Sequence, residues 1–289
     1  MNILNKVAIN FTIFCMVSLF IACNSGEVKE ALNRQPDSSA TARDSQAEKE
    51  SARPVHWTYS GEDGPEHWAS LSPVYGTCGQ GHSQSPVDLG ASVTHGKINM
   101  ELDYKTTSLS IAHNELVDDI IDNGHTIQIT AQPGSILKLG DKMYHLKQLH
   151  FHTPSEHTLD GKHFPMEMHM VHQSDDGQLA VVGVLIEEGA ENKNIAKIIP
   201  HLTNAPGESK HLADVHIELN LQIPANREAY HYTGSLTTPP CSENVEWLVL
   251  KEKLEFSAEQ IRAFSSRMHN NSRPVQPLND RKIVVDKLK

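Results

Sequence analysis

Short runs of strand-forming residues, separated by glycine, proline, asparagine and aspartate, recur along most of this chain. The runs cover residues 126–130, 136–139, 143–151, 166–172, 179–186, 217–221, 230–232 and 245–250. Helical patterns are confined to 194–202 and 257–269, and the second has Ser257 and Gln260 in capping-box spacing. The pattern predicts a mainly β (α+β) domain with a few surface helices.

The N-terminal part of the chain does not have the composition of a folded domain. Residues 1–22 contain an apolar run that is short for a membrane span and suits a secretory signal. An alanine directly before Cys23 resembles a bacterial lipoprotein signal, in which Cys23 carries the lipid; ordinary cleavage nearby is the alternative. Because few large apolar residues follow, we predict a disordered tether over 23–53 and a single folded domain over 54–289.

Charge and cysteine content restrict the partners and the compartment. The net charge of −11 argues against nucleic-acid binding and against docking on anionic lipid, so membrane contact is expected only through the N-terminal lipid. Outside the signal and Cys23, the cysteines are Cys78 and Cys241. In an oxidising compartment they form a disulfide; two separate buried thiols are the alternative. We expect an exported protein of the periplasm or cell envelope, anchored through Cys23.

The most specific local feature is a histidine pattern on two strand-like runs. His150 and His152 are two residues apart and therefore share one face of a strand, as do Glu167 and His169 on the next run. Proline and glycine between the runs permit an antiparallel pair. Three histidines on adjacent strands supply the nitrogen ligands of an open catalytic zinc site. The spacing alone also fits solvent-facing or core histidines, and cobalt or iron are alternatives to zinc.

Six blocks of sequence occur in a fixed order. They are HWTYSGEDGPEHW at 56–68, QSPVD at 84–88, NGH at 123–125, HFHTPSEH at 150–157 with EMH at 167–169, SLTTPP at 235–240 and RPVQPL at 273–278. Together they resemble the α-class carbonic anhydrases in their bacterial form, from about residue 55 to the C-terminus. The resemblance implies a large, twisted, mostly antiparallel central sheet of about ten strands with a few surface helices.

The resemblance also implies an activity, the zinc-dependent reversible hydration of carbon dioxide to bicarbonate and a proton. Zn²⁺ lowers the pKa of its water to about 7, so that hydroxide attacks CO₂. The ligands would be His150, His152 and His169. Gln148 and Glu167 correspond to residues that hydrogen-bond the first and third ligands, and the backbone carbonyl near Asn271 would serve His152.

Other positions correspond to residues that act on the substrate or the proton. Thr237 would accept the proton of the hydroxide, Glu156 would accept from Thr237, and His125 would shuttle the proton to buffer. The CO₂-binding positions would be Thr238, Val171, Val181, Leu236, Val245 and Trp247. The residues that organise water in the cleft would be Tyr59, Asn123 and Gln128. Cys78 and Cys241 fall where secreted members of the family have their disulfide.

The partners implied by the resemblance are CO₂ and bicarbonate, with aromatic sulfonamides and anions as inhibitors. A homodimer is expected from bacterial relatives, although no residue pattern marks an interface. The alternative functions are a zinc esterase or hydrolase, a catalytically inactive carbonic-anhydrase-like binding protein, and a surface adhesin that uses the fold as a platform. The presence of all three ligand histidines together with Thr237, Glu156 and His125 favours the enzyme.

Overall fold

The computed structural model describes residues 55–96, 100–113, 125–203 and 205–287. The predicted signal, the tether, Cys23 and Asn123 lie outside these residues. Among the helices of the described ranges, none is long and apolar enough to cross a membrane.

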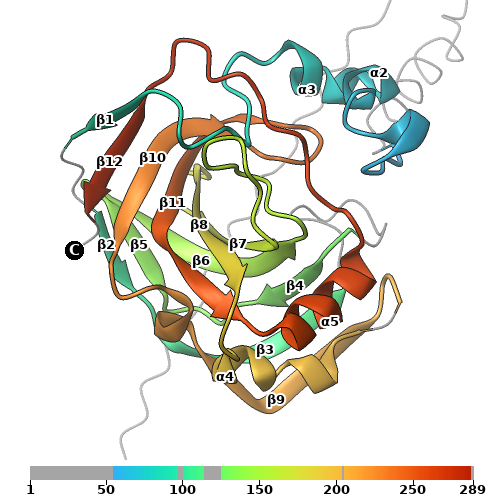
Figure 1. Cartoon of the computed structure of the whole chain (residues 1–289), viewed down its shortest axis with the longest axis vertical. Helices are drawn as coiled ribbons and strands as arrows, with labels where there is room; N and C mark the ends of the chain where they lie inside the picture. The colour runs from blue at the N-terminus through green and yellow to red at the C-terminus, as the bar shows by residue number, and fades with distance from the viewer. Residues whose placement is uncertain (1–54, 97–99, 114–124, 204, 288–289) are drawn as a thin grey trace, which may run out of the picture. The chain divides into compact units, whose positions relative to one another are not determined.

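Short strands and a few helices make up the described part of the chain (Figure 1). The strands are β1 Val93–His95, β2 Met100–Asp103, β3 Thr106–His113, β4 Ile127–Thr130, β5 Ile136–Leu139, β6 Lys142–His152, β7 Met166–Gln173, β8 Leu179–Glu188, β9 Ser209–Glu218, β10 Glu228–Ser235, β11 Glu243–Phe256 and β12 Ile283–Lys287. The α-helices are α2 Trp68–Leu71, α3 Thr77–Gln80, α4 Lys193–Ala196 and α5 Ala258–Met268. The 3₁₀ turns are η1 Gly61–Asp63, η2 Pro73–Tyr75, η3 Ile199–His201 and η4 Leu219–Gln222.

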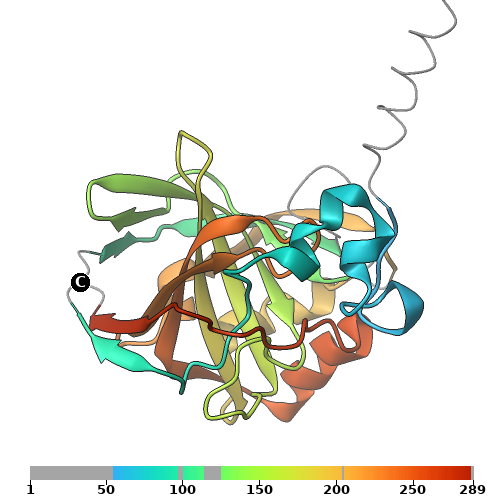
Figure 2. The ribbon, with the colours of Figure 1, turned by 90° about the horizontal axis from the view of Figure 1, so that it is seen from above.

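The strands join into one strongly curled sheet, which Figures 1 and 2 show from two directions. Its main path is β1-β12-β10-β11-β8-β7-β6-β4-β3-β9, while β5 pairs with β6, and β2 pairs with β5. The pairings of β1 with β12 and of β11 with β8 are parallel, and the other pairings are antiparallel. The predicted mostly antiparallel sheet of about ten strands is therefore confirmed: within the described residues the sheet has twelve strands, ten of them on the main path.

Most of the predicted strands are present, and the exceptions have local causes. The predicted strand 217–221 is wrong beyond Glu218, because residues 219–222 turn into η4. There Asn220 Nδ2 donates to the carbonyl of Tyr104 at 2.8 Å, and Leu221 faces solvent. The helix predicted over 257–269 is confirmed as α5 with its capping box. The helix predicted over 194–202 is instead split into α4 and η3, and Pro200, which lacks an N–H, lies in η3.

Alternation along β7 separates the core from the candidate site. Met166, Met168 and Met170 point into the largest hydrophobic cluster, which also contains Phe264 of α5. Val171, on the other face, belongs to a second cluster with Trp247. Because side chains alternate along a strand, Glu167 and His169 share the face of Val171. The strand therefore presents polar side chains inside the curl of the sheet while its opposite face is packed with methionines.

A disulfide joins the N-terminal segment to the loop that follows β10. Cys78 in α3 is bonded to Cys241, and both are packed with Trp57, Trp68 and Tyr75. The predicted disulfide is confirmed, and the alternative of two separate thiols is wrong. The bond holds the end of the loop that carries Thr237 and Thr238, where the Cys241 N–H also donates to the carbonyl of Thr238 at 2.8 Å.

Candidate zinc site

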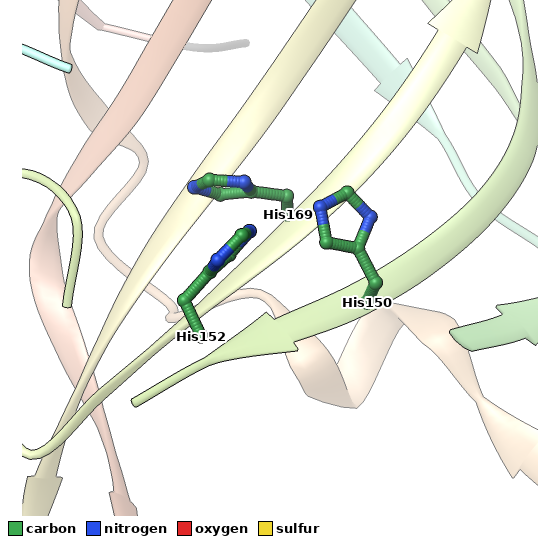
Figure 3. Close-up of side chains that lie close together, drawn as sticks. All are labelled: His150, His152 and His169. Carbon is green, nitrogen blue, oxygen red and sulfur yellow. The ribbon is translucent and has the colours of Figure 1, made fainter. Parts of the chain in front are cut away.

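Three histidine rings from two neighbouring strands converge on one point. In the antiparallel pair of β6 and β7, His150 lies opposite His169 and His152 lies opposite Glu167. One ring nitrogen of each histidine lies within 4.8 Å of the others. Figure 3 shows the three rings turned toward one another from their strands. The expected antiparallel arrangement and the shared face are both confirmed.

The second nitrogen of each ring is held by a hydrogen bond. His150 Nδ1 donates to Gln148 Oε1 at 2.8 Å, and His152 Nδ1 donates to the carbonyl oxygen of Asn271 at 2.8 Å. His169 Nε2 donates to Glu167 Oε1 at 2.9 Å. These bonds fix the tautomer of each ring. The nitrogens left with a lone pair toward the common point are Nε2 of His150, Nε2 of His152 and Nδ1 of His169.

The environment keeps the three rings neutral, as metal ligands must be. Burial lowers the pKa of His150 well below its usual value and that of His152 to about 4, and it also lowers the pKa of His169. His152 Nε2 is buried with no hydrogen-bond partner. A buried nitrogen lone pair without a partner is costly, and a cation at the common point would satisfy it. The residues therefore fit a zinc ion.

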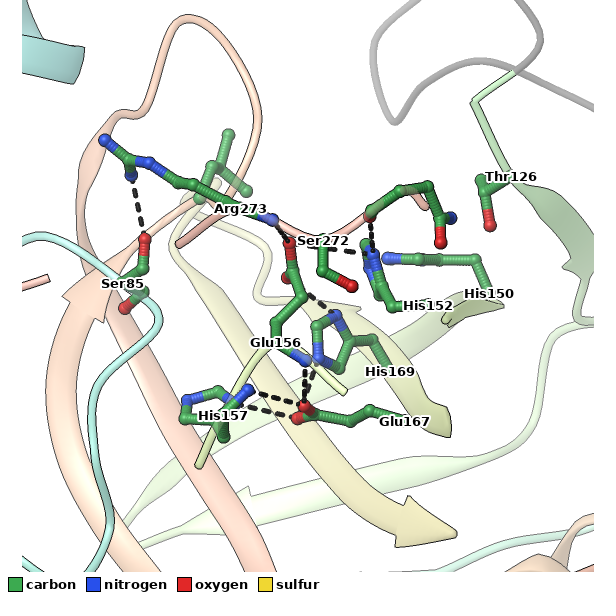
Figure 4. A network of polar contacts seen from close by, with 12 residues as sticks. Ser85, Thr126, His150, His152, Glu156, His157, Glu167, His169, Ser272 and Arg273 are labelled. Atoms are coloured by element: carbon green, nitrogen blue, oxygen red, sulfur yellow. Dashed lines mark hydrogen bonds and ion pairs between the residues drawn. The ribbon is translucent and has the colours of Figure 1, made fainter. Parts of the chain in front are cut away.

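Glu167 is a buried carboxylate that accepts from four donors. Its Oε1 accepts from His169 Nε2 and, at 2.7 Å, from His157 Nδ1. Its Oε2 accepts from the backbone N–H groups of Glu156 at 3.0 Å and His157 at 2.8 Å. Burial by itself raises the pKa of Glu167, but the electrostatic attraction and hydrogen bonds of the His157 and His169 rings outweigh it and hold the pKa well below its usual range. Figure 4 shows this network beside the ligands.

A second buried carboxylate, Glu156, lies near two of the ligand histidines, His152 and His169. Glu156 Oε1 accepts from the backbone N–H of Arg273 at 2.9 Å, while Glu156 Oε2 is buried with no hydrogen-bond partner. Burial raises the pKa of Glu156 to about 7, and the nearby His169, the Arg273 N–H and the Thr237 hydroxyl oppose the rise. The structure places Thr237 near Glu156, and the hydrogen bond expected between them stays a prediction.

A pocket opens above the three histidines and is mainly apolar on one side. Most of the expected CO₂-binding and water-organising residues line it, namely Val171, Val181, Leu236, Thr237, Thr238, Trp247, Tyr59 and Gln128. Val245 does not, because it is buried within the second hydrophobic cluster. Trp57 and Thr126 also line the pocket, and the sequence interpretation did not include them.

His125 lines the same pocket in a stacked, largely buried position. Its ring lies 3.8 Å from that of Trp57, centroid to centroid, and its Nε2 has no hydrogen-bond partner. Burial and the nearby charge of His56 lower the pKa of His125 to about 3, while a hydrogen bond with the backbone of Trp57 partly opposes them. The sequence interpretation assumed a pKa near 6.5 for His125. Because its pKa in this orientation is much lower, the stacked ring disfavours proton uptake.

The comparisons with known proteins agree with this geometry. A family model described as eukaryotic-type carbonic anhydrase matches residues 63–287. The chain belongs to the α, or eukaryotic-type, carbonic anhydrase family. A carbonic anhydrase of Pectobacterium carotovorum is 40% identical over 262 residues, which cover 90% of this chain and 99% of the relative. One from Nostoc sp. is 41% identical over 233 residues, covering 81% of this chain and 87% of the relative.

A solved carbonic anhydrase shares the fold of this chain. The α-carbonic anhydrase of Thermovibrio ammonificans, in complex with the inhibitor sulfanilamide, superposes with a TM-score of 0.73 at 41% identity. The match covers 80% of this chain and 99% of that chain. The buried histidine triad of this family member is consistent with Zn²⁺ as its cofactor.

Proposed function

We propose that this protein catalyses the reversible hydration of carbon dioxide with a zinc ion held by His150, His152 and His169. The observation that carries the proposal is the convergence of three buried rings, each with its second nitrogen hydrogen-bonded. When bound there, zinc supplies a water with a pKa of about 7, and hence hydroxide at neutral pH. The membership of the chain in the carbonic anhydrase family supports the same activity.

The protein's own residues orient the attacking oxygen. Glu156 is acceptor-only when ionised, so the Thr237 hydroxyl donates to it and keeps its own lone pairs for a donor in the pocket. The N–H of Arg273 holds Glu156 Oε1, which leaves the unpartnered Oε2 as the acceptor available to Thr237. Thr237 would thereby present a fixed hydrogen-bond acceptor beside the three histidines, where it would orient the reacting oxygen toward the pocket.

The apolar side of the pocket suits a small, uncharged substrate. Val171, Val181 and Trp247 lie on neighbouring strands, and each is no more than 3% exposed. Burial of CO₂ against them costs no hydrogen bond, whereas bicarbonate is charged and is better solvated by water. The wall therefore favours entry of CO₂ and departure of the product. This chemistry favours CO₂ over an ester as the substrate, and the complete ligand set argues against an inactive binding protein.

We assign proton release to His125, whose ring would have to leave its stacked position to accept the proton. In the stacked orientation its pKa of about 3 lies about four units below that of a zinc water, so uptake there would cost about 5 kcal/mol. Movement of the ring away from Trp57 into water would return its pKa toward the usual value. We therefore assign uptake and release of the proton to an exposed orientation of His125.

We further propose that the protein is exported and held on a membrane by a lipid on Cys23. The apolar run before Cys23 supports export, as does the Cys78–Cys241 disulfide, because such bonds persist in oxidising compartments. Residues 24–53 would then act as a tether for the catalytic domain. We also propose a homodimer, because dimers are expected from the bacterial relatives.

Stopped-flow hydration of CO₂ by the purified zinc-loaded protein tests the activity. We expect rapid hydration, loss of activity when a chelator removes the zinc, recovery when zinc is returned, and inhibition by an aromatic sulfonamide. A zinc-loaded, folded protein that does not accelerate hydration would overturn the proposal.

A further inference from the structure

A chain of buried hydrogen bonds extends behind Glu167, away from the proposed metal. His157 Nδ1 donates to Glu167 Oε1 at 2.7 Å, and His157 Nε2 lies 2.7 Å from the Tyr232 hydroxyl oxygen. A hydrogen bond of 2.9 Å joins the Tyr232 hydroxyl to Ser85 Oγ, and Ser85 Oγ accepts from the backbone N–H of Ser235 at 3.0 Å. Each side chain from Glu167 to Ser85 is at most 2% exposed. Both ring nitrogens of His157 are thus engaged.

The chain is closely packed along its length. A methyl group on Gly234 would collide with Ser85 Oγ and lie 2.7 Å from the Tyr232 ring. A methyl group on Gly183 would lie 3.0 Å from Glu167 Oε1. The two glycines therefore leave the hydroxyls and the carboxylate with little freedom to adopt other positions.

We propose that Tyr232 and Ser85 are positioning residues for the zinc site, which act through His157 and Glu167 to hold the ring of His169 and slow the release of zinc. This inference rests on the proposed zinc-binding function, and it assigns a task to a part of the N-terminal segment that does not contact the metal ligands.

The physical reason is the cost of leaving a buried ring nitrogen unpaired. If Tyr232 lost its hydroxyl, His157 Nε2 would be buried without a partner, at a cost of about 1–3 kcal/mol. Rotation of the His157 ring could relieve that cost, but it would withdraw the Nδ1–H from Glu167. With one donor fewer, the carboxylate would hold His169 less firmly, and partners of this kind change metal affinity by about 10- to 100-fold.

The molecule contains a matched tyrosine–histidine pair that does not reach the site. Tyr104 Oη lies 2.7 Å from His172 Nε2, and Tyr104 and His172 are 2% and 0% exposed. The other nitrogen, His172 Nδ1, pairs with the backbone carbonyl of Ala180 rather than with a carboxylate at the zinc site. Tyr104→Phe therefore removes the same hydroxyl from the same kind of buried pair, and it controls for a general loss of stability.

The experiment measures zinc release from the full-length protein. Wild type, Tyr232→Phe, Ser85→Ala and Tyr104→Phe are loaded with one zinc per chain and mixed with excess chromophoric chelator. We expect release from Tyr232→Phe to be about 10-fold faster than from wild type, with a smaller acceleration for Ser85→Ala. Release from Tyr104→Phe should remain within twofold of wild type, even if its thermal stability falls as much as that of Tyr232→Phe.

The outcomes separate this inference from the proposed function. Release at the wild-type rate from both Tyr232→Phe and Ser85→Ala would overturn the inference while the zinc site stands. An equal acceleration in Tyr104→Phe would also overturn it, because the effect would then follow stability. If Tyr232→Phe does not fold, the rate of zinc release from Ser85→Ala is compared with that from Tyr104→Phe. Faster release from Ser85→Ala supports the inference, and equal rates overturn it. A wild-type protein that takes up no zinc would overturn the proposed function and the inference together.

Discussion

The backbone N–H of Arg273 donates to Glu156 Oε1 at 2.9 Å, so a residue near the C-terminus fixes the carboxylate that faces Thr237. The Arg273 guanidinium extends the connection, since its Nη2 donates to the carbonyl of Cys78 at 2.9 Å and its Nη1 to Gln84 Oε1 at 2.9 Å. Arg273 thus ties Glu156 to the disulfide-bonded N-terminal segment.

The first prediction concerns the acceptor character of Glu156. In Glu156→Gln the amide NH₂ would donate to Thr237, and the Thr237 hydroxyl proton would point into the pocket and oppose the hydroxide proton. We expect kcat/KM for CO₂ hydration to fall about 100-fold while zinc content is unchanged. Glu246→Gln, which alters a half-buried carboxylate paired with His231 outside the pocket, is the control and should retain full activity. Unchanged kcat/KM in Glu156→Gln would contradict the assigned role.

The second prediction concerns His125. His125→Ala should lower kcat at least about 10-fold in dilute buffer, because proton release then lacks its acceptor, and concentrated imidazole should restore kcat. The ratio of kcat to KM, which reflects CO₂ attack, should change little. His145→Ala, a substitution at a more exposed histidine, is the control. An equal loss at every buffer concentration would refute the shuttle role.

The third prediction concerns His172 and the pH dependence of stability. Burial lowers its pKa to about 4 in the folded protein, against about 6.5 in an unfolded chain. Above pH 6.5 the group is neutral in both states and contributes no pH dependence. Between pH 6.5 and 4 the unfolded state binds the proton more tightly, so the free energy of unfolding should fall as the pH falls, by up to about 3 kcal/mol from this residue.

Urea unfolding of the zinc-free protein at several pH values measures that slope. His172→Gln should flatten it between pH 6.5 and 4, whatever the substitution does to stability at pH 7. A slope that is identical in the wild type and His172→Gln would show that His172 does not titrate as described.

The fourth prediction concerns the proposed lipid anchor. Cys23→Ser removes the proposed acceptor for the lipid, so the protein should move from the membrane fraction to the soluble fraction of the cell envelope. Activity of the released domain should be unchanged, because the site lies within the folded domain. Membrane fractionation equal to that of the wild type would count against lipidation.

Local pattern was sufficient to predict the zinc-ligand face. His150, His152 and His169 could be placed on shared faces because side chains alternate along strands, and the structure pairs His150 directly with His169. The same rule failed at Leu219 and Leu221, whose alternation imitates a strand although the chain turns there. The edge strand β1 was not predicted, because it is fully exposed and carries no apolar alternation, and its neighbour β12 was also missed.

Contacts between distant residues were beyond the reach of local pattern. The bond between Tyr232 and Ser85 joins residues 147 positions apart, and that between His157 and Tyr232 joins residues 75 apart. Neither residue type nor spacing signals such a pair. The low pKa of His125 likewise depends on stacking against Trp57 and on His56, which only the folded chain brings together.

Anomalous diffraction at the zinc edge, from crystals of the zinc-loaded protein, tests the central claim most directly. We predict one strong peak per chain, bonded to Nε2 of His150, Nε2 of His152 and Nδ1 of His169 at about 2.0–2.1 Å. A peak between His157 and Glu167 instead, or no peak at the three histidines, would contradict the account.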